Sequence, residues 1–277
     1  MKRRLHSADA FFIFCIKNGV EMRKTDMIKC RWKEAVREKT NGCTILMTAM
    51  LLLLGSALIW QGWKKRQEDP EVTETAAAGK QPYVVVIDAG HGGRDGGKVS
   101  VDGTTYEKDV NLAIAGKLRT YLEAENITVI MTREGDEGLY TEADSNKKAA
   151  DLKHRIEMID HAVPDLVVSI HQNSYHEPQI KGAQVFYYTT SEEGSRLAGI
   201  IQNQLRVSLD PDNHREAKAN NTYYLLKKTE ATIVIVECGF LSNPEEAALL
   251  KTAEYQDRVA WNIHLGIMQY LNCQQNS

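Results

Sequence analysis

Four side chains in this sequence could bind a metal or carry a proton. They are, in chain order, His91, Glu107, His171 and Glu237. Two imidazoles and one carboxylate form a common catalytic zinc set, which leaves a fourth position for water. His91, Glu107 and His171 match that composition and predict a Zn²⁺ site. Glu237 would then take a proton from water and pass it to a leaving group, so the pattern predicts metal-assisted amide hydrolysis.

Three of these residues come at the ends of apolar, β-branched runs. The runs predict strands at residues 83–87, 166–170 and 233–236, which precede His91, His171 and Glu237. Ligand crevices in open α/β sheets form at the carboxyl ends of the strands, so residues far apart in sequence can converge there. Glu107 opens the first predicted helix and is placed to join them.

Each residue also has a structural interpretation when it is taken alone. Residues 90–93, Gly-His-Gly-Gly, are as typical of a tight turn or a phosphate-binding loop as of a metal-binding loop. An acid at a helix start, such as Glu107, usually favours the helix dipole. A charged Glu237 at the end of a buried strand is costly unless it is paired or lies beside a metal. The joint placement therefore favours a functional site.

Cysteine and arginine side chains offer further candidates. Cys238 could act as a nucleophile with a histidine as base. Successive strand residues point to opposite faces, so Cys238 faces away from the crevice if Glu237 faces it, and we expect it in core packing. Arg94, Arg133 and Arg155 could contact substrate, but pairing with a structural carboxylate is the expected role of each.

Apolar periodicity predicts the remaining elements. Further strands are expected at 127–131, 183–188 and, as a short edge strand, 223–226. Helices are expected at 107–122, 152–163, 191–205, 243–251 and 259–270, where Ser191 and Asn243 are the predicted caps and Glu246 a partner of the second cap. This alternation predicts a single α/β domain with a mainly parallel mixed sheet flanked by helices.

Composition limits the classes of function. The 277 residues are 43% hydrophobic and 26% charged, which is typical of a folded chain. The net charge of -3 leaves no broad basic face, so no nucleic-acid partner is expected. The five cysteines form no CxxC pair, and a disulfide framework is not expected.

The N-terminal part predicts a membrane segment. Residues 44–60 carry no charge and end in Trp60, as suits a membrane interface. Basic residues before this run predict that 1–43 is cytoplasmic, 44–60 a transmembrane helix, 61–81 a linker and 82–273 a folded domain outside. A cleaved signal peptide is the alternative, because Gly-Ser-Ala at 55–57 resembles a cleavage site. Either interpretation exports the domain.

Several motifs carry a family resemblance. They are VVVIDAGHGGRDGG at 84–97, YEKDVNLA around Glu107, MTR at 131–133, SIHQN at 169–173 and ECGFLSNPEE at 237–246. Over about residues 83–270 the sequence resembles the zinc-dependent N-acetylmuramoyl-L-alanine amidases of the type 3 family. Ala89 stands where many relatives have proline, a difference in turn stiffness that leaves the proposed ligands intact.

The resemblance implies zinc held by His91, Glu107 and His171, with Glu237 as catalytic acid and base. It implies a peptidoglycan substrate, cut at the amide between N-acetylmuramic acid and L-alanine. Residues 210–228 and the single membrane segment resemble sporulation-specific amidases, which implies a role in muramic δ-lactam formation in spore cortex and in germination. An accessory or activator protein is a further expected partner, besides the membrane.

Two other classes of protein, a wall-binding module and a nucleotide-binding protein, explain fewer of the sequence features than an amidase does. A wall-binding module without catalysis would not need Glu237. A nucleotide-binding protein would have a GxGxxG or GxxxxGK[ST] pattern after the first strand, and neither pattern follows it.

Overall fold

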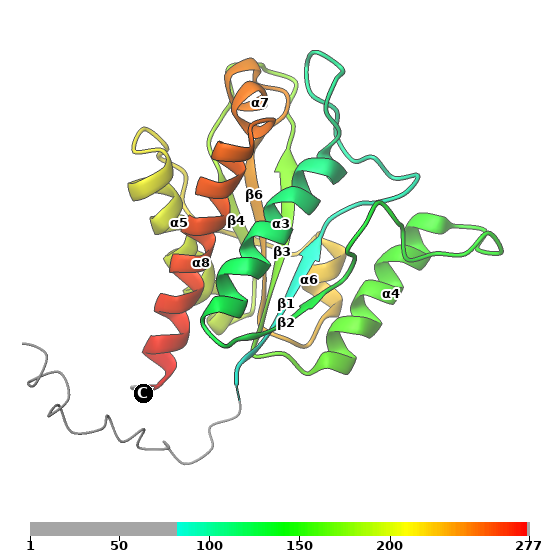
Figure 1. Cartoon of the computed structure of the whole chain (residues 1–277), viewed down its shortest axis with the longest axis vertical. Coiled ribbons are helices and arrows are strands. Elements are labelled where there is room, and N and C mark those ends of the chain that lie inside the picture. The colour runs from blue at the N-terminus through cyan, green and yellow to red at the C-terminus, as the bar shows by residue number, and fades with distance from the viewer. Residues whose placement is uncertain (1–81, 276–277) are drawn as a thin grey trace, which may run out of the picture. The chain divides into compact units, whose positions relative to one another are not determined.

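The sheet is the frame of the fold. In the computed structural model, which describes residues 82–275, six strands form one sheet in the order β2-β1-β3-β6-β4-β5 (Figure 1). The strands are β1 Val84–Ala89, β2 Thr128–Met131, β3 Leu166–Asn173, β4 Gln184–Tyr188, β5 Lys218–Asn220 and β6 Ile233–Phe240. All neighbours are parallel except β4 and β6, which are antiparallel. The predicted mainly parallel mixed sheet is confirmed.

Helices cover both faces of this sheet (Figure 1). They are α3 Glu107–Ala124, α4 Lys147–Ala162, α5 Glu192–Gln204, α6 Tyr224–Lys228, α7 Pro244–Leu250 and α8 Ala253–Gln275, with a π-helical turn η1 at Leu205–Leu209. Apolar side chains of α3, α5 and α8 form the larger core against one face, and those of α4 and α6 a smaller core against the other. The predicted α/β domain is confirmed.

Helix caps lie where the sequence predicts them, with one difference. The Ser191 side chain caps α5, and the Asn243 side chain accepts the backbone N–H of Glu246 at the start of α7. The Glu246 carboxylate does not return to the cap. It accepts the backbone N–H groups of Gly182 and Phe240, so it joins α7 to the loop before β4 and to the end of β6.

The two central strands are longer than predicted. β3 and β6 continue past Ile170 and Val236, so His171 and Glu237 lie within strands and are register partners. Ladder hydrogen bonds use backbone groups, so a polar side chain that faces a cleft does not end the pairing. The register shifts only between His171 and Asn173.

The predicted edge strand at 223–226 is wrong, because these residues open the short helix α6. The side chain of Asn220 accepts the backbone N–H groups of Thr222 and Tyr223, and this turn ends β5 before the helix begins. Leu225 and Leu226 are buried on one side of α6. The edge strand is β5 instead.

The predicted segments 1–43, 44–60 and 61–81 lie outside the described residues. Among residues 82–275, no helix combines the length and apolar character needed to cross a membrane. The described residues belong to the compact unit Gln81–Ser277.

Candidate metal centre

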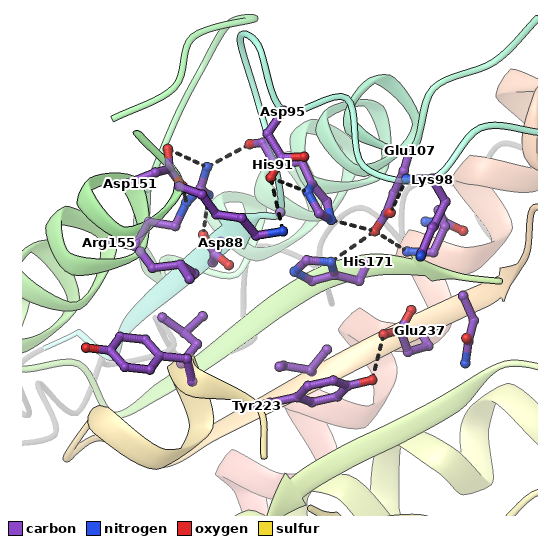
Figure 2. Close-up of a pocket in the computed structure, with 18 of the residues that line it drawn as sticks. Asp88, His91, Asp95, Lys98, Glu107, Asp151, Arg155, His171, Tyr223 and Glu237 are labelled. Atoms are coloured by element: carbon purple, nitrogen blue, oxygen red, sulfur yellow. Dashed lines mark hydrogen bonds and ion pairs between the residues drawn. The ribbon is translucent and has the colours of Figure 1, made fainter. Parts of the chain in front are cut away.

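The four predicted site residues line one cleft at the carboxyl edge of the sheet (Figure 2). His91 follows β1, Glu107 begins α3, and His171 and Glu237 lie on neighbouring strands. The cleft has a volume of about 320 Å³. Residues separated by up to 146 positions (237 minus 91) therefore meet, as the strand-end pattern predicts.

Three of these side chains converge on a small volume. His91 Nε2 lies 3.2 Å from Glu107 Oε1, and His171 Nδ1 lies 3.0 Å from the same oxygen. One ligand atom from each residue lies within 4.8 Å of the others. The imidazole rings of His91 and His171 meet edge to face, with centroids 5.0 Å apart. The set has the composition of a catalytic zinc site with three protein ligands.

The Glu107 carboxylate is fixed by the backbone. Its Oε2 accepts the N–H of Lys98 at 2.8 Å, and its Oε1 accepts the N–H of Gln172 at 3.0 Å. Burial raises the pKa of this carboxyl, but the adjacent imidazoles of His171 and His91 outweigh burial and hold the pKa well below its usual range. The side chain is therefore ionised and ready to bind a cation.

Asp95 orients the first histidine. Its Oδ2 lies 3.0 Å from His91 Nδ1, so an Nδ1–H donated to Asp95 leaves Nε2 free to act as a ligand. Figure 2 shows Asp95 and Glu107 on either side of the His91 ring. His91 itself has φ of 64°, a left-handed conformation that turns the chain away from β1 into the glycine-rich loop.

Gly90 makes room for the second histidine. A Cβ placed on Gly90 would lie 2.3 Å from both Cε1 and Nε2 of His171, closer than real atoms approach. Any side chain here would displace the ring. The glycine before His91 therefore serves His171, a residue about 80 positions away, through close approach of β1 and β3.

Glu237 lies beside the three ligands and is nearly buried, with 7% of its surface exposed. Its Oε1 accepts a hydrogen bond from the Tyr223 hydroxyl at 3.4 Å (Figure 2). Among the described residues, no donor reaches the buried Oε2. Burial, with a smaller contribution from the charge of Glu107, raises the pKa of the Glu237 carboxyl above its ordinary value. A raised pKa makes this carboxylate a better proton acceptor than an exposed glutamate, as suits a residue that must take up a proton and later give it back.

Cys238 points away from the cleft, as predicted. Its side chain is fully buried in the larger core, and burial raises the pKa of the thiol far above its usual range. A protonated thiol in apolar packing is not a reactive nucleophile.

The arginine predictions hold for two of three residues. Arg94 pairs with Glu142 at the surface, and Arg155 pairs with the buried Asp88. Arg133 differs from the prediction, because its guanidinium donates to backbone carbonyls.

Sequence reasoning missed the residues that support the ligands. Asp95 could have been found, because a carboxylate four residues after a loop histidine lies within reach of its ring. Tyr223 gave no such signal, since its approach to Glu237 depends on the turn that starts α6. The backbone donors of Lys98 and Gln172 carry no side-chain signature at all.

The donor chemistry fits a zinc ion. Two imidazole nitrogens and one ionised carboxylate oxygen converge, and Asp95 fixes the tautomer of His91 as carboxylates do beside zinc-binding histidines. Fold and site together define an α/β protein with a candidate catalytic metal centre of the His₂Glu type.

The comparisons with known proteins identify the family. The family described as N-acetylmuramoyl-L-alanine amidase matches residues 85–269. The germination-specific N-acetylmuramoyl-L-alanine amidase of Bacillus subtilis (strain 168) is 42% identical over 190 residues, which cover 68% of this chain and 79% of that protein. The chain therefore belongs to the N-acetylmuramoyl-L-alanine amidase family and is an amidase of peptidoglycan.

Solved structures agree with this assignment. The CwlD amidase from Clostridioides difficile, solved in complex with the GerS lipoprotein, is 40% identical, with a TM-score of 0.67 over 69% of this chain and 99% of that one. An N-acetylmuramoyl-L-alanine amidase from Clostridium difficile 630 is 32% identical, with a TM-score of 0.62 over 70% of this chain and 98% of that one.

Proposed function

We propose that this amidase is zinc-dependent, that His91, Glu107 and His171 hold the ion, and that Glu237 is the catalytic acid and base. The convergence of three ligand atoms within 4.8 Å, beside a buried carboxylate in the same cleft, is the observation that supports it most. When bound, zinc supplies Lewis acidity toward the scissile carbonyl and toward water.

The chain's own residues handle the proton. Glu237 accepts the proton that the attacking water loses and returns it to the leaving nitrogen of L-alanine. The Tyr223 hydroxyl holds Oε1, so the unpartnered Oε2 is the atom that carries the proton. Asp95 keeps the His91 ring in orientation and Glu107 stays ionised throughout.

Release of free N-terminal L-alanine from purified peptidoglycan tests this function. The full-length chain should release it and lose that activity on treatment with a zinc chelator, with recovery on adding zinc. Activity that survives complete removal of metal would contradict the zinc proposal, and cleavage of a different bond would contradict the named reaction.

The domain acts on the outer side of the membrane in this proposal. Residues 44–60 anchor the chain or serve as a signal sequence, 1–43 precede the anchor, 61–81 link it to the domain, and 82–273 form the catalytic domain. Peptidoglycan lies outside the membrane, so the substrate requires this orientation.

A role in spore cortex maturation is the narrower part of the proposal. The similarity to an amidase described as germination-specific supports it. Stem-peptide removal would supply the muramic residues from which δ-lactam forms. Deletion spores should lack muramic δ-lactam and germinate poorly. Normal δ-lactam in their cortex would contradict this role but not the amidase activity.

We also propose an accessory protein. The related CwlD amidase was solved with the GerS lipoprotein, and this chain matches 99% of that amidase chain. Affinity purification of the full-length chain from sporulating cells should recover a protein that increases its activity. An unchanged activity in the presence of every recovered protein would contradict an activator.

A further inference from the structure

Two buried arginines lie directly under the loop that carries His91. Arg133 follows β2 and Arg155 lies on α4, with exposed fractions of 3% and 1%. Their guanidinium groups donate to consecutive backbone carbonyls, those of Ala89, Gly90 and His91. The carbonyl side of the loop is thus held by two fixed cations.

Arg155 holds the histidine itself. Its Nη2 donates to the His91 carbonyl at 2.7 Å and its Nη1 to the Ala89 carbonyl at 2.9 Å. The same guanidinium donates from Nη1 to Asp88 and from Nε to Asp151, each at 2.6 Å (Figure 2). The two carboxylates fix the arginine, and the arginine fixes the backbone of His91.

Arg133 joins the segments of two different ligands. Its Nη2 donates to the Gly90 carbonyl at 3.2 Å and to the Lys108 carbonyl at 2.7 Å. Gly90 precedes His91, and Lys108 follows Glu107. One nitrogen therefore ties the loop of the first ligand to the helix start of the second.

The loop needs such support because its backbone is strained. The φ of 64° at His91 is left-handed, a strained conformation that a non-glycine residue keeps only where its surroundings impose it. Gly92 and Gly93 also have positive φ and give little resistance to rearrangement. The guanidinium hydrogen bonds hold the carbonyls of this loop, and backbone hydrogen bonds between Gly92 and Asp95 close it.

We propose that Arg133 and Arg155 are positioning residues for the metal: they hold His91 and Glu107 at zinc-binding separation before the ion arrives. This inference rests on the ligand set proposed above. A planar guanidinium reaches several carbonyls at once in a fixed geometry, whereas the ammonium of lysine is a single point on a flexible chain. Lysine keeps the charge and loses the geometry, so Arg133→Lys and Arg155→Lys separate the two contributions.

Zinc affinity of the metal-free full-length chain tests the proposal. Titration against a chromogenic chelator gives the dissociation constant, and thermal unfolding of the metal-free chain shows that each variant is folded at the titration temperature. We expect the dissociation constant to rise by roughly 10–100-fold in each lysine variant, as for loss of other groups that orient metal ligands. Arg94→Lys is the matched control, because Arg94 pairs with Glu142 at the surface, and it should bind zinc as the wild type does.

His91→Ala separates failure of this inference from failure of the proposed function. If His91→Ala binds zinc like the wild type, the ligand set is wrong. If His91→Ala loses zinc while both lysine variants keep wild-type affinity, the ligand set stands and the positioning role is overturned, whatever the lysine changes do to unfolding. Failure of both lysine variants to fold would also overturn it, in favour of a role in folding alone.

Discussion

The two oxygens of the Glu237 carboxylate have different surroundings. Oε1 accepts a hydrogen bond from Tyr223, and no donor of the described residues reaches Oε2. The hydroxyl therefore fixes the side chain and leaves one oxygen for the proton transfer that we propose. Tyr223 comes from the loop before α6, so this contact places a residue of the opposite cleft wall beside the proposed catalytic carboxylate (Figure 2).

Tyr223→Phe tests this contact. The substitution keeps the ring and removes the hydrogen bond, which at 3.4 Å is long and worth about 1 kcal/mol. We expect kcat to fall roughly fivefold, with KM and zinc content unchanged. Steady-state kinetics on a soluble muropeptide measure kcat and KM, and metal analysis measures the zinc content. A wild-type kcat would contradict a role for the hydroxyl, and loss of zinc would place that role in metal binding instead.

The junction of β1 with the loop that follows it determines the positions of two histidine side chains. His91 requires the turn, and His171 requires that Gly90 has no side chain. The neighbouring strands β1 and β3 set this distance, since Ala89 and Ile170 are register partners. The junction is therefore sensitive to a single methyl group.

Gly90→Ala should displace the His171 ring and reduce zinc affinity. The matched control is Gly116→Ala in α3, where an added Cβ meets nothing within 4 Å and alanine favours the helix by about 1 kcal/mol. Chelator competition should show weaker zinc binding only in Gly90→Ala. Equal affinities in the two variants would mean that the ring position in the structure does not govern metal binding.

The contact between α4 and β1 should respond to acid. Burial raises the pKa of Asp88, but Arg155 and the Ser169 hydroxyl outweigh it and lower the pKa from 3.8 to about 2. A carboxyl whose pKa is lower in the folded than in the unfolded chain stabilises the fold at every pH above the unfolded-state pKa. This contribution to the free energy of unfolding, roughly 2 kcal/mol, is lost as the pH falls from about 4 to 2.

Denaturant unfolding of the metal-free chain measures this contribution. Asp88→Asn should be less stable than the wild type at pH 6, because it leaves the buried Arg155 without a partner. The difference should shrink as the pH falls below 4. A difference that stays constant down to the lowest pH at which both chains fold would contradict the assigned pKa.

Much of the fold and of the site could be predicted from the sequence. Apolar runs located the central strands, and the rule that parallel strands present their carboxyl ends together placed His91 and His171 at one edge. Strand alternation placed Cys238 in the core. These predictions succeed because they depend on local periodicity and on one topological rule.

The failures share a physical cause. Residues 223–226 are aromatic or apolar, as in many strands, but the Asn220 side chain turns the chain into α6. Arg133 was expected to pair with a carboxylate, yet its partners are carbonyls from segments distant in sequence. A side chain's hydrogen-bond partners depend on tertiary packing, which local patterns do not encode.

At the scale of the whole molecule, the proposed function requires the catalytic domain to lie outside the membrane. Protease added to intact protoplasts should remove the domain at 82–273, because the apolar segment 44–60 is proposed to anchor it there. A cytoplasmic enzyme in the same cells should survive as the control. Full protection of the domain from protease would contradict the proposed orientation.

In the proposed mechanism, metal binding and proton transfer belong to different residues of one site. Zinc content and hydrolysis measured together on His171→Ala and Glu237→Gln test it most directly, with Cys238→Ala as the control from the opposite strand face. His171→Ala should lose both zinc and activity. Glu237→Gln should keep about one zinc per chain while hydrolysis falls by roughly 10²–10⁴-fold. Loss of zinc from Glu237→Gln as complete as from His171→Ala, or wild-type hydrolysis by Glu237→Gln, would contradict the claim.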